Sequence, residues 1–220
     1  MLSPGLAFIF DMDGVIVDSN PVHRASWAAF ARRYGLETTD AMLQRMYGKR
    51  NDDIVRDYFG AGLPPEEVAA RGKAKEQLYR EMVSDRIEEI LVPGLRWFLE
   101  MHQGTPMGIA SNAEPENIDF LLDRTGLRPC FRVVVDGHQV RNPKPHPDIY
   151  LRAAELLGVA PPNCIVFEDS HSGVAAAISA GMRVIGLSTT EVNLHGTHIT
   201  IDNFLSTNLD QWLRSQSPSA

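Results

Sequence analysis

Five short apolar runs along the chain end in polar or turn-forming residues. They occupy residues 6–10, 107–110, 132–135, 165–167 and 183–187. A short, continuous apolar run of this kind is typical of a parallel strand that is buried on both faces. Helical patterns lie between the later runs, at residues 94–102, 115–125, 147–157 and 173–180. Strands that alternate with helices predict an α/β core built on a Rossmann-like, mostly parallel sheet.

Residues 18–88 follow a different pattern, in which no run is typical of a strand. Apolar and aromatic positions instead recur at helical spacing. The three stripes are His23, Trp27, Phe30 and Tyr34; Ile54, Val55, Tyr58 and Phe59; and Val68, Lys75, Leu78, Tyr79 and Met82. We therefore predict an α-helical cap domain over residues 18–88, inserted into a core domain of residues 1–17 and 89–220.

Length and charge narrow the classes of function. The chain has 220 residues and a net charge of −7, which argues against nucleic-acid binding because that rests on clustered lysine and arginine. Two distant cysteines, Cys130 and Cys164, favour a cytosolic chain with free thiols. Asp11 and Asp13 interrupt the first apolar run, unlike in a signal peptide, and no stretch approaches the ~20 apolar residues of a spanning helix. We expect a cytoplasmic protein without nucleic-acid or membrane partners; its oligomeric state is not predicted.

The first candidate motif is Asp11-Met12-Asp13-Gly14, directly after the first predicted strand. Ligands of open α/β sheets bind at the carboxyl ends of the strands, so the two carboxylates are well placed for chemistry. Gly14 would allow main-chain amides to approach an anion closely. An acidic turn is the alternative; a calcium-binding loop would need later ligands that are missing.

Two further motifs offer hydrogen-bond donors for a phosphate group. Ser111 and Asn112 follow the second predicted strand, and Lys144 lies in a proline-rich loop after the third. A hydroxyl, an amide and an ammonium can all bind phosphate oxygens. The alternatives are ordinary ones: Ser and Asn also cap helices, and a lysine in a turn is usually solvated.

The fourth motif, Glu168-Asp169, follows the fourth predicted strand. Two carboxylates at a strand end repel each other unless something positive lies between them. Hard oxygen ligands without sulfur suit Mg²⁺. The alternative is that these acids only stabilise the N-terminus of the following helix.

Each motif is common by itself, but all four occur in order, and each lies at the end of a predicted strand or in the loop just beyond one. In this arrangement the chain resembles the haloacid dehalogenase superfamily of phosphohydrolases over essentially its whole length, including the inserted helical cap. It is most similar to the β-phosphoglucomutase-like branch. The residues that carry this closer match are Asp18-Ser19, His23, Trp27, Lys144-Pro145-His146-Pro147-Asp148, Phe167-Glu168-Asp169-Ser170 and Gly173.

The resemblance implies a role for each matching residue. Asp11 is expected to be the nucleophile that forms an aspartyl-phosphate, and Asp13 the general acid and base. Mg²⁺ is expected to be held by Asp11, the main-chain carbonyl of Asp13 and Asp169, with Glu168 acting directly or through water. The residues expected to contact the phosphoryl group are Gly14, Ser111, Asn112 and Lys144.

Three residues of the predicted cap match substrate-binding positions of this branch. His23 is expected to face the active site, or else to pack beside Trp27 as a first-turn helix residue. Lys75 is expected to reach toward the substrate or Asp13, or else to be a surface lysine. Arg50 resembles an arginine that binds a second phosphate. However, it lies one residue closer to the preceding glycine than in the mutase pattern. On a helix, a shift of one residue turns the side chain by roughly 100°.

The resemblance leaves two enzymatic functions and one non-enzymatic one. A phosphohexomutase must also hold a second phosphate, yet Glu114 is acidic where the mutases have a basic residue, and Pro115 lacks a main-chain donor. We therefore predict a Mg²⁺-dependent phosphatase that acts on a small phosphomonoester such as a sugar phosphate, with a β-phosphoglucomutase-type phosphohexomutase as the alternative. A non-catalytic relative would be expected to lack Asp11, Asp13 or Lys144, and all three are present.

Overall fold

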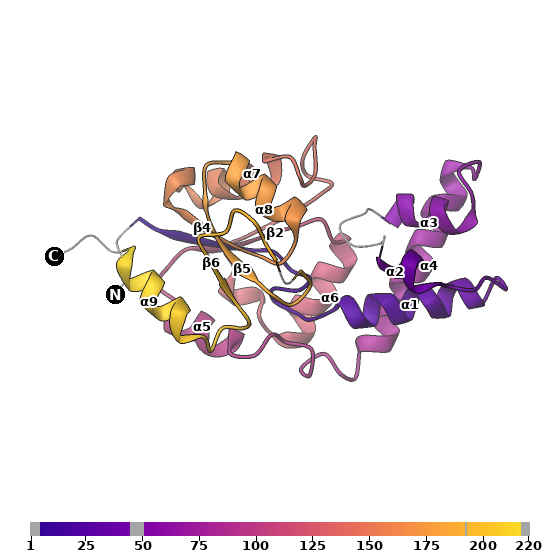
Figure 1. The fold of residues 1–220 in the computed structure, drawn as a ribbon, viewed down its shortest axis with the longest axis horizontal. Coiled ribbons are helices and arrows are strands. Elements are labelled where there is room, and N and C mark those ends of the chain that lie inside the picture. Colours follow the sequence, from indigo (N-terminus) through magenta and orange to yellow (C-terminus); the bar gives the residue numbers. More distant parts are fainter. Residues whose placement is uncertain (1–4, 45–50, 192, 217–220) are drawn as a thin grey trace. The chain divides into compact units, whose positions relative to one another are not determined.

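The computed structural model describes residues 5–44, 51–191 and 193–216. The chain divides into two compact units (Figure 1). The core unit comprises Met1–Asp18 and Glu88–Ala220, and the helical unit comprises Ser19–Ile87. None of the helices in the described ranges combines the length and the apolar character needed to cross a membrane.

The core unit is built on a parallel sheet of six strands in the order β3-β2-β1-β4-β5-β6. The strands are β1 (Ala7–Phe10), β2 (Met107–Ser111), β3 (Val133–Asp136), β4 (Cys164–Glu168), β5 (Arg183–Leu187) and β6 (Ile199–Ile201). This arrangement confirms the predicted Rossmann-like α/β core. The sequence pattern found the first five strands and missed β6, which has three residues at the sheet edge.

Helices flank the sheet on both faces (Figure 1). They are α5 (Leu95–Met101), α6 (Pro115–Thr125), α7 (Asp148–Leu157), α8 (His171–Ser179) and α9 (Thr207–Ser215), with short 3₁₀ turns at Arg128–Cys130 and Pro161–Asn163. Four of the five helices match predicted ones, and α9 was not predicted. Glycines in the left-handed conformation end α6 and α7, at Gly126 and Gly158.

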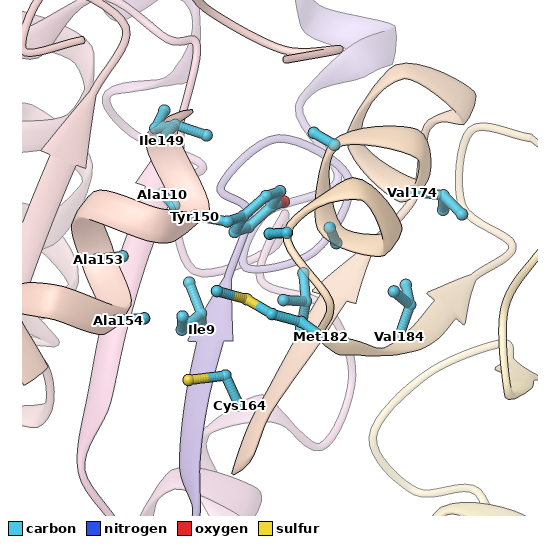
Figure 2. Close-up of a cluster of buried hydrophobic side chains, with 14 of the residues drawn as sticks. Ile9, Ala110, Ile149, Tyr150, Ala153, Ala154, Cys164, Val174, Met182 and Val184 are labelled. Atoms are coloured by element: carbon cyan, nitrogen blue, oxygen red, sulfur yellow. The ribbon is translucent and has the colours of Figure 1, made fainter. Parts of the chain in front are cut away.

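Alternate residues of the central strands pack on opposite faces of the sheet. Ile9 and Val166 face α7 and α8, within the buried cluster shown in Figure 2. On the other face, the rings of Phe10 and Phe167 stack with centroids 4.7 Å apart, and Phe98 of α5 packs against both. β1 and β4 are neighbours, with Phe10 paired to Phe167. The residues that follow these two strands therefore lie side by side at the carboxyl end of the sheet.

The helical unit contains α1 (Asn20–Arg32), α2 (Asp40–Gln44), α3 (Asn51–Phe59) and α4 (Pro65–Val83). Its buried cluster includes Trp27, Phe30, Val55 and Val68, as the three predicted stripes require. Tyr34 lies beyond the end of α1 at Arg32 and is 49% exposed, but its ring still packs against Phe30 of the first stripe with centroids 5.3 Å apart.

Candidate active site

The sheet topology gathers the strand-end motifs of the core unit. Asp11 follows β1, and its N–H donates to the carbonyl of Phe167 in β4 at 3.0 Å. Glu168 is the last residue of β4, and Ser111 is the last residue of β2, on the other side of β1. The motifs therefore come together because three adjacent parallel strands end at the same edge.

Lys144 forms the ionic link between two of these motifs. Its Nζ donates to Oδ1 of Asp11 and to Oε1 of Glu168, each at 2.6 Å. The lysine and both carboxylates are buried. Burial alone would lower the pKa of the Lys144 ammonium, but the attraction of Asp11 and Glu168 outweighs it and raises that pKa. The solvated-lysine alternative is therefore wrong.

The carboxylate of Glu168 is held by five donors. Its Oε1 accepts from Lys144 and from the Tyr150 hydroxyl, at 2.6 and 2.7 Å. Its Oε2 accepts from the Asp169 N–H and from the N–H and hydroxyl of Ser170, at 3.0–3.1 Å. Burial acts to raise the pKa of Glu168, but Lys144 and these donors outweigh burial and lower it. Glu168 is therefore a fixed anion.

The N-cap of α8 is Ser170, not Glu168 or Asp169. The Ser170 hydroxyl accepts from the Gly173 N–H at 3.1 Å and so occupies the N-cap position. The N-cap hydrogen bond therefore does not come from Glu168 or Asp169. The Asp169 carboxylate instead accepts a hydrogen bond from the hydroxyl of Thr190, in the loop after β5.

Three carboxylates form a group with the chemistry of a metal site. Oxygen atoms of Asp11, Glu168 and Asp169 all lie within 4.8 Å of one another, and all three residues are buried. Burial and the repulsion of Glu168 and Asp13 raise the pKa of Asp11 to about 7, against the opposing effect of Lys144. Burial and the repulsion of Glu168 and Asp11 also raise the pKa of Asp169. Three acids facing one ammonium leave an excess of negative charge, which a hard divalent cation such as Mg²⁺ fits.

Gly14 approaches this group too closely for any side chain. Its φ is +80°, and a Cβ at this position would lie 1.8 Å from Oδ2 of Asp169. The neighbouring Asp13 is half-buried, and its charge contributes to the raised pKa of Asp11. The loop after β1 thus lies directly against the carboxylate group.

The donor pair Ser111 and Asn112 lies at the carboxyl end of β2, next to β1 in the sheet. Ser111 is 2% exposed, and its Oγ accepts from the Ala113 N–H at 3.2 Å. Asn112 lies beside Gly137, whose added Cβ would meet the Asn112 Oδ1 at 3.5 Å. The N-cap residue of α6 is Glu114, so the capping alternative for Ser111 and Asn112 is wrong.

Two of the three predicted cap residues meet inside the helical unit. Lys75 is 1% exposed, and its Nζ lies 2.8 Å from Nδ1 of His23 and 2.8 Å from Oε1 of Glu76. The His23 ring stacks on Tyr79 with centroids 3.9 Å apart. The surface-lysine alternative for Lys75 is therefore wrong. Arg50 lies outside the described residues, and the roles of His23 and Lys75 in substrate binding stay predictions.

Sequence reasoning missed four polar residues around these groups: Glu76, Tyr150, Thr189 and Thr190. Thr189 and Thr190 follow β5 closely, so the rule that ligands bind at strand ends could have found them. Tyr150 lies on the buried face of α7, where its hydroxyl gives no signal beyond that of an aromatic core residue.

Comparisons with known proteins agree with this geometry. The family model for haloacid dehalogenase-like hydrolases matches residues 6–181. The chain is 33% identical to fructose-1-phosphate phosphatase YqaB of Escherichia coli, over 80% of this chain and 93% of that protein. It is 30% identical to the β-phosphoglucomutase of Bacillus subtilis, over 82% of each chain. The crystal structure of a haloacid dehalogenase-type hydrolase from Entamoeba histolytica superimposes with a TM-score of 0.86 at 26% identity, over 95% of this chain and 98% of that one. With its strand-end carboxylates, its buried lysine and a family match across most of its length, the chain belongs to the haloacid dehalogenase-like hydrolase family.

Proposed function

We propose that the protein is a Mg²⁺-dependent phosphatase that hydrolyses a small phosphomonoester, a sugar phosphate above all, through a phosphorylated Asp11. The observation that carries this proposal is the buried Lys144, which bonds both Asp11 and Glu168 at 2.6 Å beside the carboxylate of Asp169. This grouping supplies a nucleophilic carboxylate together with positive charge to receive a phosphate dianion.

The charge of Lys144 addresses the main obstacle to the reaction. A carboxylate and a phosphate dianion repel each other, so attack by Asp11 requires that their charges be screened. At ~4 Å and an effective dielectric constant of ~20, a unit charge contributes about 4 kcal/mol. We expect Ser111 and Asn112 to donate hydrogen bonds to the other phosphoryl oxygens, and Gly14 to leave room for them.

The proposed reaction has two steps. In the first, a carboxylate oxygen of Asp11 bonds to phosphorus, the ester P–O bond breaks, and the Asp13 carboxyl group gives its proton to the leaving alkoxide. In the second, the Asp13 carboxylate takes a proton from water, the water oxygen bonds to phosphorus, and the P–O bond to Asp11 breaks. Orthophosphate leaves, and both aspartates return to their starting states.

Asp11, Asp169 and the main-chain carbonyl of Asp13 are the residues we expect to hold Mg²⁺. Because five donors already occupy the Glu168 carboxylate, we assign Glu168 to a contact through water. When bound, the ion supplies neutralisation of the phosphoryl charge.

A mutase is the second candidate, since relatives of this chain carry both names. The N-cap position of α6 favours hydrolysis. Glu114 presents a carboxylate there, 3.1 Å from Nε2 of His138, and this negative charge opposes a second phosphate group. The predicted contacts of His23, Lys75 and Arg50 would then select among singly phosphorylated substrates.

One experiment separates the two candidates. The purified protein is incubated with Mg²⁺ and either fructose 1-phosphate or β-glucose 1-phosphate, with and without a trace of glucose 1,6-bisphosphate. Inorganic phosphate and glucose 6-phosphate are both followed. Phosphate release that needs no bisphosphate supports the phosphatase, whereas bisphosphate-dependent glucose 6-phosphate formation would establish the mutase.

Two variants test the roles of the aspartates. Asp11→Asn is expected to abolish turnover with the fold intact, and appreciable residual activity would overturn its assignment as nucleophile. Asp13→Asn is expected to bind phosphate but to turn over very slowly. Normal kinetics of this variant would remove Asp13 from acid–base catalysis.

A further inference from the structure

Two adjacent threonines after β5 reach the carboxylate group from a third loop. The Thr190 hydroxyl donates to Oδ2 of Asp169. The Thr189 hydroxyl donates to the main-chain carbonyl of Gly14 at 2.5 Å. Because β5 pairs with β4, with Gly186 opposite Glu168, the loop that follows β5 begins next to the end of β4.

These two hydrogen bonds join parts of the chain that are distant in sequence. The loop after β1 is closed on itself by the Gly14 N–H, which donates to the Val17 carbonyl at 2.7 Å. Thr189 holds the next peptide unit of this loop, because its hydroxyl donates to the Gly14 carbonyl. The loop that carries Asp11 and Asp13 is thereby tied, through two neighbouring hydroxyls, to the carboxylate of Asp169.

We propose that Thr189 and Thr190 are positioning residues for the divalent cation, with Thr190 orienting the Asp169 carboxylate and Thr189 orienting the main chain that follows Asp13. This inference rests on the Mg²⁺ site of the proposed function. Neither threonine is assigned a contact with substrate.

The geometry around Asp169 gives the Thr190 hydroxyl its effect. The χ2 torsion of an aspartate has broad energy minima, so the side chain by itself does not determine which carboxylate oxygen faces a ligand. The Thr190 hydroxyl engages Oδ2, and Gly14 lies against the same oxygen without a side chain between them. Without the hydroxyl, the buried carboxylate loses a donor and can turn. Partners that orient a metal ligand in this way typically contribute 10–100-fold in metal affinity.

Threonine offers matched variants for the test. Thr190→Val keeps the shape and removes the hydroxyl, whereas Thr190→Ser keeps the hydroxyl and removes the methyl group. Mg²⁺ binding is measured calorimetrically at about pH 8 without substrate, so the readout does not depend on turnover. We expect Thr190→Val to weaken Mg²⁺ binding by roughly 10–100-fold and Thr190→Ser to stay within about threefold of the wild type. Thr189→Val should weaken binding less, and Thr200→Val, on the edge strand β6, should not change it.

Each outcome decides the proposal. Unchanged affinity in Thr190→Val, or equal weakening in Thr190→Val and Thr190→Ser, would overturn it, because the hydroxyl would then not be the cause. Circular dichroism checks the fold of every variant, and Thr190→Ala replaces Thr190→Val if that variant does not fold. If the wild type itself binds no Mg²⁺, the metal part of the proposed function fails, and this inference fails with it.

Discussion

Lys144 donates a 2.6 Å hydrogen bond to Oδ1 of Asp11, a residue 133 positions earlier in the chain. Both side chains are buried, and the same ammonium bonds Glu168. A buried ion pair of this kind adds little net stability, but removing one partner leaves uncompensated charge. We therefore infer that Lys144 serves to balance the negative charge of the site. Its removal should lower both the stability of the fold and the activity.

The first prediction concerns the charge of Lys144. Lys144→Met leaves Asp11 and Glu168 without their shared cation, so we expect the free energy of unfolding to fall by about 3 kcal/mol at neutral pH. We expect phosphatase turnover to fall by roughly 10³-fold, because about 4 kcal/mol of charge stabilisation is lost. Urea unfolding and phosphate release are measured. Lys73→Met, at an exposed position of α4, is the control and should be near neutral; similar behaviour of the two variants would contradict the assignment.

The second prediction concerns pH and Mg²⁺. The pKa of Asp11 is raised to about 7 by burial and by its acidic neighbours, and the pKa of Asp169 is also raised. The metal-free folded state therefore binds protons more tightly than the unfolded chain, whose aspartates titrate near pH 4. Between about pH 4 and about pH 7, the stability of the metal-free protein should be highest at the acidic end and should fall as the pH rises. The pKa of Glu168 is lowered by Lys144 and the other donors, so Glu168 contributes the opposite slope at the acidic end of this window and below it.

Mg²⁺ should reverse this trend, because it binds the deprotonated carboxylates. Unfolding by urea is measured between about pH 5 and pH 8, in EDTA and in excess Mg²⁺. The stabilisation by Mg²⁺ should be small at about pH 5 and largest at about pH 8. A stabilisation that does not change with pH, together with a flat curve in EDTA, would argue that these carboxylates do not share the ion.

The third prediction isolates the Tyr150 hydroxyl. Tyr150→Phe keeps the ring that packs in the core of Figure 2 and lies 4.9 Å from the Lys144 ammonium. It removes one of the donors to the charged Glu168, so we expect a destabilisation of about 1–2 kcal/mol. Tyr34→Phe removes a hydroxyl from a half-exposed tyrosine and should cost less than about 0.5 kcal/mol. Equal destabilisation of the two variants in thermal unfolding would show that the hydrogen bond from Tyr150 to Glu168 does not contribute to stability.

The sequence pattern anticipated the parts of the fold that repeat a strong local signal. The runs that became β1 and β4 are apolar throughout because both faces of those strands are covered. The strand β6 has only three residues, one of them the exposed Thr200, so its run is too short to differ from a loop. Its place at the edge of the sheet comes from pairing with β5, which is a tertiary contact.

For the site, residue type, position after a strand and the resemblance to a known family together brought Asp11, Lys144 and Glu168 into one hypothesis. The same reasoning could not decide whether Lys75 is buried, although its helical stripe placed it among Val68 and Tyr79. Burial depends on what a side chain meets, and for Lys75 this is the acceptor pair of His23 and Glu76. His23 lies 52 positions earlier, in α1, and a contact with so distant a residue leaves no periodic pattern in the sequence.

The last prediction compares two glycines that share a left-handed backbone and differ in their surroundings. Gly14 and Gly126 have φ values of +80° and +66°, so an alanine at either position carries a similar backbone cost, on the order of 1–2 kcal/mol. An alanine Cβ at Gly126 would meet nothing within 4 Å. At Gly14 it would overlap the carboxylate of Asp169, which must then move away from Thr190.

We therefore expect Gly14→Ala to be the more destabilised variant in urea and to lose Mg²⁺ affinity by at least about 100-fold. Gly126→Ala should show the backbone cost alone and bind Mg²⁺ as the wild type does. The comparison cancels the conformational term and leaves the contact between residue 14 and Asp169. If both variants bound Mg²⁺ normally, the close approach of Gly14 to Asp169 would be a packing detail, and the Asp169 carboxylate would not be needed at that place to hold the ion.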